Sequence, residues 1–225
     1  MRLRSRRART VLAALCVLLP HALRRFVHGR LLGHQLHPTA RIGRSIVDVD
    51  LLVMGEGAVI GPLTLIRGCA EVRLDRDARI GSLVWVNSVR AGKGYFVGQD
   101  RRPALVMGVS SAITSLHFID ACDLVELGDY AGIGGVGCIV QTHSVDVEHM
   151  RQSTAPIRLG HHAMVSTRCT LLLGAEVPDR SMVAAGAVVT GKLEGHHLFA
   201  GVPAKPVRPL DPDGPFFTRS GRWIW

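Results

Sequence analysis

Aliphatic residues recur every six positions between Leu159 and Val189, and small residues hold a second position with the same period. The first position of successive six-residue blocks is always aliphatic: Leu159, Val165, Leu171, Val177, Val183 and Val189. The fifth position of the first five blocks is always small: Ala163, Cys169, Ala175, Ser181 and Ala187. Neither the 3.6-residue period of a helix nor the two-residue period of a strand produces this pattern. A fixed six-residue period predicts an all-β fold, a parallel β-helix of hexapeptide repeats.

In such a fold, each hexapeptide forms one short strand and one turn. The aliphatic side chain points into a narrow triangular core. The small side chain lies beside the corner, where a larger group would collide with the next layer. Stacked coils pair their backbone groups with their neighbours, so only the end coils expose strand edges.

The same frame continues upstream of Leu159. Leu127 and Ile133 open two blocks with Ala131 and Gly137 in the small position, and Ile139 opens the next block. Earlier blocks open at Leu36, Ile42, Met54 and Ile60. The recurrence predicts a β-helix domain over residues 36–205, preceded by residues 1–35 and followed by a tail at 206–225.

Three similar segments, which start at Val72, Val125 and Ile157, indicate that the frame restarts after interruptions. The main interruptions span residues 91–108 and 144–156. Loops on a rigid framework commonly carry function. We therefore expect the functional residues near these two segments.

The N-terminal segment combines a basic start with a short apolar run. Five arginines lie within the first nine residues, and the run Val11–Leu19 ends at Pro20. Nine apolar residues are too few to cross a bilayer, which takes about twenty, and no signal-peptide cleavage site follows. We expect a basic, amphipathic helix that breaks near Pro20. It either lies on an anionic membrane surface or caps one end of the β-helix.

Composition narrows the class of protein. The chain has a net charge of +9, 47% hydrophobic and 20% charged residues, which favours a globular protein over a disordered one. It has no zinc-finger spacing and no RNA-binding signature, so we do not expect a nucleic acid partner. The five cysteines are widely spaced and none forms a C-x-x-C pair. This argues against a disulfide framework and a zinc site, and favours a cytoplasmic protein. Such a protein could also bind peripherally to the inner face of the cell membrane.

The segments 159–191 and 199–210 (FAGVPAKPVRPL) resemble the hexapeptide-repeat acyltransferase superfamily, in particular the maltose- and galactoside-type and the exopolysaccharide and lipopolysaccharide O-acetyltransferases. The resemblance implies a left-handed β-helix and a homotrimer, with acetyl-coenzyme A bound between neighbouring subunits. It also implies direct acetyl transfer to a hydroxyl of a saccharide or cell-envelope glycan precursor, with no metal.

His143 is the leading catalytic candidate. In the frame opened at Ile139 it occupies the fifth position, where an imidazole does not fit, so we expect its ring to project outward beside the second interruption. The resemblance implies a histidine at a corresponding place, and an imidazole can take the proton of an attacking hydroxyl. Asp146, Glu148 or a backbone carbonyl could orient the ring, and a backbone N–H of a neighbouring coil could stabilise the oxyanion. His117 is the second candidate, to bind the acceptor or to face His143 across a subunit interface.

The resemblance also places the coenzyme. Small side chains allow it a close approach, and cations can hold its phosphates. Ala185, Gly201 and Lys205 match the family's coenzyme-binding positions, and Arg208 lies near Lys205. Ser166 and Thr167 replace the glycine that is often found in that coil, and we include them among the coenzyme-binding candidates.

Two alternatives from other classes stay open. One is a zinc enzyme on the same fold, similar to the gamma-class carbonic anhydrases, with His117, His143 and His149 as ligands. The other is a non-catalytic β-helix that acts as a scaffold protein.

Overall fold

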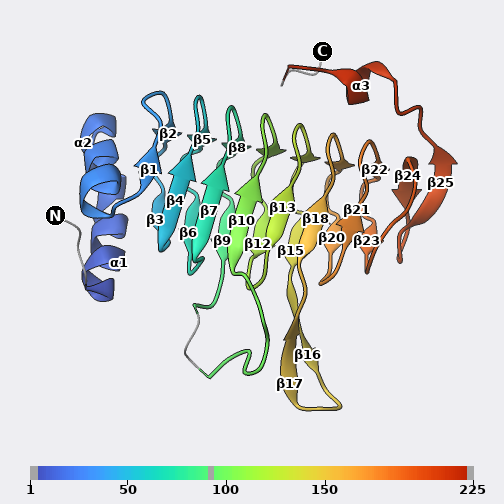
Figure 1. The fold of residues 1–225 in the computed structure, drawn as a ribbon, viewed down its shortest axis with the longest axis horizontal. Coiled ribbons are helices and arrows are strands. Elements are labelled where there is room, and N and C mark those ends of the chain that lie inside the picture. The colour runs from blue at the N-terminus through green and yellow to red at the C-terminus, as the bar shows by residue number, and fades with distance from the viewer. Residues whose placement is uncertain (1–4, 91–93, 222–225) are drawn as a thin grey trace.

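The computed structural model describes residues 5–90 and 94–221. Three sheets, parallel except for the last strand of sheet B, wind into one elongated β-helix (Figure 1). Sheet A contains β1 (Gln35–Leu36), β4 (Leu51–Met54), β7 (Glu71–Leu74), β10 (Ala104–Met107), β13 (Val125–Leu127), β18 (Ile157–Leu159) and β21 (Glu176–Val177). Sheet B contains β2 (Arg41–Ile42), β5 (Val59–Ile60), β8 (Arg79–Ile80), β11 (Ala112–Ile113), β14 (Gly132–Ile133), β19 (Met164–Val165), β22 (Met182–Val183), β24 (His197–Ala200) and β25 (Lys205–Pro209). Sheet C contains β3 (Ile46–Asp48), β6 (Leu65–Arg67), β9 (Trp85–Asn87), β12 (Phe118–Asp120), β15 (Ile139–Gln141), β20 (Thr170–Leu171) and β23 (Val188–Val189). The coil is left-handed, so the predicted fold class is confirmed.

The frame of the C-terminal coils is confirmed residue by residue. Every aliphatic and small position predicted between Leu159 and Val189 is buried, and Leu159 pairs in register with Val177, one coil later. The buried residues join the upstream coils in one continuous apolar core. Because each coil buries only a thin layer, the core depends on neighbouring coils for its cover.

The frame shifts by one residue after Ile133, which corrects the predicted boundaries. Cys138 and Val140 point inward in place of Gly137 and Ile139, and Ile139 is 42% exposed. The turn after Ile133 has one residue more than the regular turns, and Gly137 accommodates it at a φ of 75°. After Val140, the next residue that points inward is therefore Thr142, which is fully buried.

Both predicted interruptions project from the same side of the β-helix (Figure 1). The first lies between β9 and β10, because Ala104 already pairs with Glu71, and so it ends earlier than the predicted Gly108. The second is an antiparallel hairpin of β16 (His143–Asp146) and β17 (Arg151–Thr154). The restarts at Val72, Val125 and Ile157 all lie in sheet A, as the frame predicts.

The N-terminal segment caps the first coil, which confirms one of its two predicted placements. It consists of α1 (Arg6–Leu15), a 3₁₀ turn η1 (Cys16–Leu18), α2 (His21–Phe26) and a π-helical turn η2 (Val27–Leu31), with the predicted break at Pro20. Arginines satisfy carbonyl groups at the open edge: Arg24 donates to the Ile42 carbonyl at 2.7 Å and Arg25 to the His37 carbonyl at 2.8 Å. Since an open β-edge invites pairing with other chains, this cover protects the end of the coil. Among the described residues, no helix is long and apolar enough to cross a membrane.

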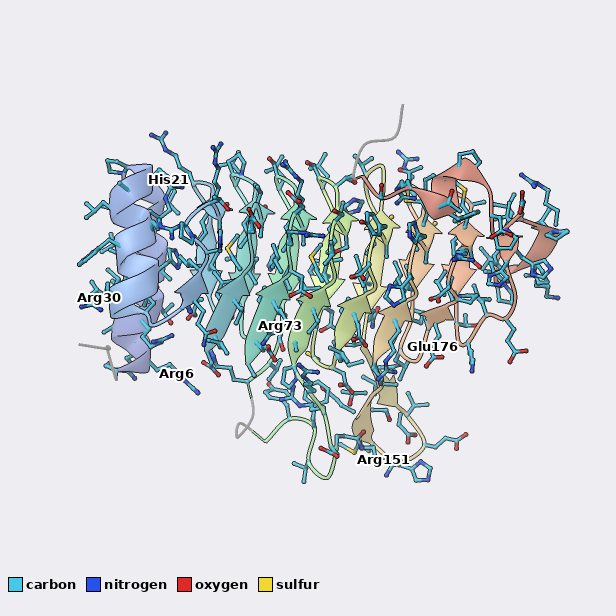
Figure 2. The ribbon with its side chains drawn as sticks, turned by 45° about the horizontal axis from the view of Figure 1, so that its top comes forward. Arg6, His21, Arg30, Arg73, Arg151 and Glu176 are labelled. Carbon is cyan, nitrogen blue, oxygen red and sulfur yellow. The ribbon has the colours of Figure 1, made fainter. Side chains whose placement is uncertain are left out.

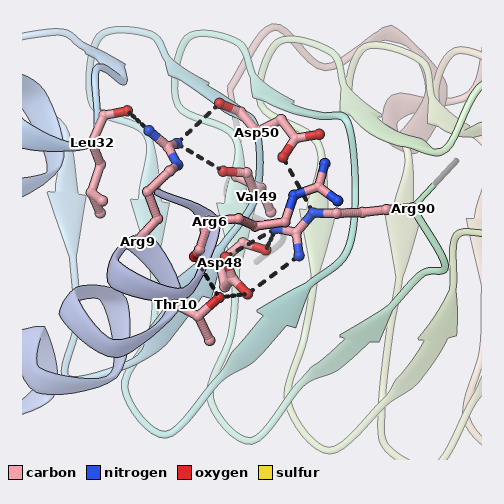
Figure 3. A network of polar contacts seen from close by, with 8 residues as sticks. All are labelled: Arg6, Arg9, Thr10, Leu32, Asp48, Val49, Asp50 and Arg90. Atoms are coloured by element: carbon pink, nitrogen blue, oxygen red, sulfur yellow. Dashed lines mark hydrogen bonds and ion pairs between the residues drawn. The ribbon is translucent and has the colours of Figure 1, made fainter. Parts of the chain in front are cut away.

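Polar contacts lock α1 onto the turn that follows β3 (Figure 3). The Thr10 hydroxyl donates to Asp48 Oδ2 at 3.0 Å, and an Arg9 guanidinium nitrogen donates to the Asp50 carbonyl at 3.3 Å. Arg90, in the connection between β9 and β10, reaches the same place and pairs with Asp48 at 2.9 Å and with Asp50 at 3.2 Å. Two segments that lie far apart in the sequence are thereby fixed at one corner.

At the other end, β24 pairs antiparallel with β25. The tail then runs back along the turns between sheets A and B, through the short helix α3 (Pro215–Thr218) (Figure 1). The Tyr130 hydroxyl donates to the Ser220 carbonyl at 2.9 Å, which fastens the tail to the β-helix.

Candidate active site

His143 lies at the corner between sheets C and A, where the hairpin leaves the β-helix. Its ring points outward and its side chain is 32% exposed. The orientation agrees with the sequence-based expectation, but the reason differs. Since the frame shifts by one, Thr142 takes the inward position and His143 is the first residue of β16.

Asp120, at the end of β12, orients the His143 ring. Its carboxylate accepts a hydrogen bond from His143 Nδ1, and its side chain is 4% exposed. Since a carboxylate only accepts, Nδ1 bears the proton and Nε2 keeps a free lone pair. The hydrogen bond to Asp120 raises the pKa of His143, and burial opposes the shift in part. The arrangement is a histidine poised to take a proton.

Backbone contacts hold Asp120 in place. Its second carboxylate oxygen accepts from the Cys122 N–H at 3.0 Å, and the Thr142 hydroxyl donates to its carbonyl at 3.0 Å. Thr142 in turn accepts from the Asp123 N–H at 2.9 Å. Such support fixes the geometry of the Asp120–His143 pair.

Asp120 was not predicted from the sequence, and the expectation of Asp146 or Glu148 in its place is corrected here. Asp146 binds within the hairpin, to the His149 ring at 3.0 Å and to Arg151 at 3.1 Å, and the His149 hydrogen bond lowers the pKa of Asp146. Glu148 is exposed in the turn of the hairpin. Asp120 lies 23 residues before His143, and only the stacking of β12 on β15 brings them together.

The structure also corrects the expectation for His117. The residue occupies a small, inward position two residues before Ile119, and it is 3% exposed. The Cys138 N–H donates to Nδ1 at 3.1 Å, so Nε2 bears the proton and donates to the Thr114 hydroxyl at 2.8 Å. Burial lowers the pKa of His117. A neutral ring with both nitrogens engaged inside the coil is not placed to bind an acceptor.

The first interruption folds over His143. The Phe96 ring packs edge-on against the imidazole, with centroids 5.7 Å apart. Arg101 stacks on Phe96 and donates to the carbonyls of Cys122 and Val89 at 2.8 and 2.7 Å. In Figure 2, this loop and the hairpin that bears Arg151 project together from one edge of the β-helix. The two interruptions therefore form one site.

One cluster within residues 5–90 and 94–221 has the donors for a metal ion: Asp120, Cys122 and His143, with ligand atoms within 4.8 Å of one another. Asp120 is already engaged by the other two residues, through His143 Nδ1 and the Cys122 N–H. Burial and the hydrogen bond to Asp120 raise the pKa of the Cys122 thiol to about 12, so it stays protonated at neutral pH. The histidine set of the zinc alternative is not assembled within one chain, because His117 is buried and His149 is bound to Asp146.

Four of the predicted coenzyme positions share one corner, between sheets B and C. Ser166 and Thr167 lie in the turn after β19, Ala185 in the turn after β22 and Gly201 after β24. Stacked backbone bonds connect these turns, from Gly186 to Thr167 at 3.0 Å for example. Lys205 and Arg208 are exposed on β25, which pairs with β24 beside this corner.

The two predicted halves of the site lie apart within one chain. In the coil that contains β15, the turn between sheets B and C precedes the strand, and His143 lies just after its C-terminal end. The outer face of sheet C therefore separates His143 from the predicted coenzyme groove. A single chain does not bring the predicted coenzyme positions together with His143.

No family model matches the chain. The chain is 30% identical over 114 residues to "Putative acetyltransferase SACOL2570" of Staphylococcus aureus (strain COL), a match over 49% of this chain and 57% of that protein. The chain thus spans a little over half of this curated relative. It is also 23% identical over 171 residues to the bifunctional protein GlmU of Clostridium novyi (strain NT), which covers 72% of this chain and 31% of that protein.

Solved structures share the fold. The hexapeptide-repeat containing acetyltransferase VCA0836 of Vibrio cholerae superposes with a TM-score of 0.52 at 18% identity, over 92% of this chain and 93% of that one. A point mutant of AntD, an N-acyltransferase of Bacillus cereus solved in complex with dTDP and coenzyme A, gives 0.51 at 12% identity, over 83% and 88%. These findings confirm the predicted similarity to the hexapeptide-repeat acyltransferases.

Proposed function

We propose that the protein is an acetyl-coenzyme A-dependent O-acetyltransferase that acts on a hydroxyl of a saccharide or cell-envelope glycan precursor. The observation that carries the proposal is the His143–Asp120 pair, placed under two loops of a β-helix whose relatives are named acetyltransferases. A hydroxyl is a poor nucleophile at neutral pH, so a positioned base is the group that the reaction needs.

In the proposed mechanism, His143 Nε2 takes the proton of the acceptor hydroxyl as its oxygen attacks the thioester carbonyl. The carbon–oxygen bond forms and a tetrahedral oxyanion results, which a backbone N–H of a neighbouring coil stabilises. The carbon–sulfur bond then breaks, and the imidazolium returns the proton to the leaving thiolate. Asp120 is a positioning residue: it fixes the ring and stabilises its charged form.

The predicted donor groove runs along the turns that contain Ser166, Thr167, Ala185 and Gly201, with Lys205 and Arg208 beside the phosphates. Support comes from the stacking of these turns and from the AntD structure, which was determined with coenzyme A. Small side chains at Ala185 and Gly201 leave the backbone accessible to the pantetheine chain.

A second copy of the chain would join the groove to the base. The outer face of sheet C bears an apolar ladder, defined here as the register-paired residues Ile46, Leu65, Trp85, Phe118 and Ile139. Trp85 is 49% exposed and Phe118 39%. Exposed apolar surface of this extent marks an interface. We place neighbouring subunits of a homotrimer on the ladder, so that the predicted donor groove of one chain lies against His143 of another chain.

The N-terminal cap supports peripheral contact with a membrane. Its inner face is buried, whereas Val11, Leu15, Leu18, Leu23 and Phe26 are exposed on the outside, among arginines. A basic, apolar helical surface binds the interface of anionic bilayers. Flotation with vesicles of anionic lipid tests this contact: wild type should float, Leu18→Glu should not, and binding by neither would exclude it.

The enzymatic proposal is tested with a panel of acyl-coenzyme A donors and glycan acceptors, read out as free thiol. We expect acceptor-dependent thiol release with acetyl-coenzyme A. Stoichiometric zinc in the purified protein, or no thiol release with any acceptor, would favour the zinc enzyme or the scaffold protein in its place.

A further inference from the structure

A basic groove runs between α1 and the outer edge of sheet C. It has a volume of about 680 Å³, and its walls include Arg6, Arg7, Arg67, Arg90 and Asp48. Ile46 and Leu65 of the apolar ladder also line it, so the groove borders the proposed subunit interface. Arg6 and Arg7 come from the start of α1, Arg67 from the end of β6, and Arg90 from the segment after β9. Three separate segments therefore supply its charge.

One arginine, Arg90, pairs with both acidic neighbours, and the single negative charge left over is outweighed by Arg6, Arg7 and Arg67. Arg90 pairs with Asp48 at 2.9 Å and with Asp50 at 3.2 Å, and Thr10 also donates to Asp48 (Figure 3). No ion pair holds Arg6, Arg7 or Arg67 within residues 5–90 and 94–221. Their guanidinium groups remain available for an anion from outside the chain.

The groove is in register with the proposed catalytic pair. The last residues of neighbouring sheet C strands align, from Asp48 to Arg67, Asn87 and Asp120. Adjacent strands lie about 4.8 Å apart, so Arg67 lies roughly 10 Å from Asp120 along this row. Arg101 bridges the two places, because it binds the Val89 carbonyl at the groove and the Cys122 carbonyl beside Asp120.

We infer that this groove binds a phosphate or diphosphate group of the acceptor, at the end remote from the acetylated hydroxyl. Guanidinium groups match phosphate oxygens in geometry and charge. A sugar ring with its hydroxyl at His143 would extend its anomeric phosphate along the row toward Arg67. The substrate class is then a phosphate-linked saccharide, whether joined to a nucleotide or to a lipid. The inference rests on the proposed function for the identity of the acceptor, but not for the anion site itself.

Binding of inorganic pyrophosphate to the full chain, measured by calorimetry, tests the site. Saturating coenzyme A is present, so that the donor's own phosphate contacts are filled. We expect wild type to bind and Arg67→Ala to lose about tenfold in affinity, with a larger loss when Arg6 and Arg7 are also replaced by Ala. Arg41→Ala, which removes an exposed arginine from sheet B, is the matched control and should bind as wild type does.

Two further arms identify the source of the phosphate. Uridine diphosphate represents the nucleotide-linked class, and a water-soluble short-chain prenyl diphosphate the lipid-linked class. The diphosphate that binds wild type more tightly, and whose binding is lost in Arg67→Ala, identifies the class of acceptor.

His143→Ala separates this inference from the catalytic proposal, because it should bind pyrophosphate unchanged. Loss of thiol release with intact binding leaves the anion site standing, and thiol release that survives in His143→Ala refutes only the catalytic role. The inference is overturned if wild type does not bind pyrophosphate, or if Arg67→Ala binds it equally well.

Discussion

The C-terminal coils and the middle coils follow the same six-residue frame but tolerate different departures from it. Between Leu159 and Val189, each inward position is aliphatic or small and all are buried. In the middle coils, one histidine takes a small inward position, and another follows a one-residue shift of the frame. His117 turns inward, where its own coils satisfy both nitrogens, whereas His143 turns outward and is paired with Asp120. A histidine in these coils is thus either a polar group enclosed in the core or a group exposed at the surface beside the two interruptions, and its hydrogen-bond partners distinguish the two cases.

The largest effect is expected at His143. His143→Ala should lower the rate of acetyl transfer by about 10²–10⁴-fold, because it removes the base. The melting temperature should change little, since the ring is on the surface. Rates are compared at equal concentrations of folded protein, and full activity in this variant would exclude His143 as the base.

Replacement of Trp85 by Glu should break the subunit interface. A charge in the centre of the apolar ladder would be buried without a partner on association. Light scattering should show a smaller assembly, and activity should fall with it. Leu18→Glu places the same charge on the outer face of the cap and should leave the assembly intact, whereas an unchanged assembly in Trp85→Glu would remove the ladder from the interface.

His117→Ala should act on stability and not on the rate. It leaves a cavity and an unpaired Cys138 N–H, which together cost about 2 kcal/mol of unfolding free energy. Burial lowers the pKa of His117, so below the unfolded value of about 6.5 the unfolded chain takes up a proton that the folded chain does not. The His117 contribution should therefore decrease as pH falls, and denaturant titrations at two pH values measure it. A pH-independent difference from wild type would contradict the buried, neutral state.

The smallest effect is expected at Asp146. Asp146→Ala loosens only the hairpin pairs with His149 and Arg151, and exposed pairs contribute little. The rate should stay within about twofold of wild type under steady-state assay. A large loss of rate would support the prediction from the sequence that Asp146 orients the His143 ring.

The contrast between the two regions also explains what the sequence could predict. The frame of the C-terminal coils, the two interruptions and the break at Pro20 follow from local patterns. The shift after Ile133 does not, because a glycine-rich turn accepts an additional residue without a change in composition. Asp120 was missed for a related reason: its contact with His143 arises from the stacking of two coils, and position along the chain favoured the nearer Asp146.

The pH dependence of kcat/KM shows whether Asp120 holds His143 as the proposed base. In wild type the rate should fall as pH drops through the pKa of His143, which the Asp120 hydrogen bond raises above its ordinary value. In Asp120→Asn that pKa loses its support, so the inflection should move to lower pH while the plateau falls by about 10–100-fold. An inflection that stays at the same pH in Asp120→Asn would show that Asp120 does not control the pKa of His143.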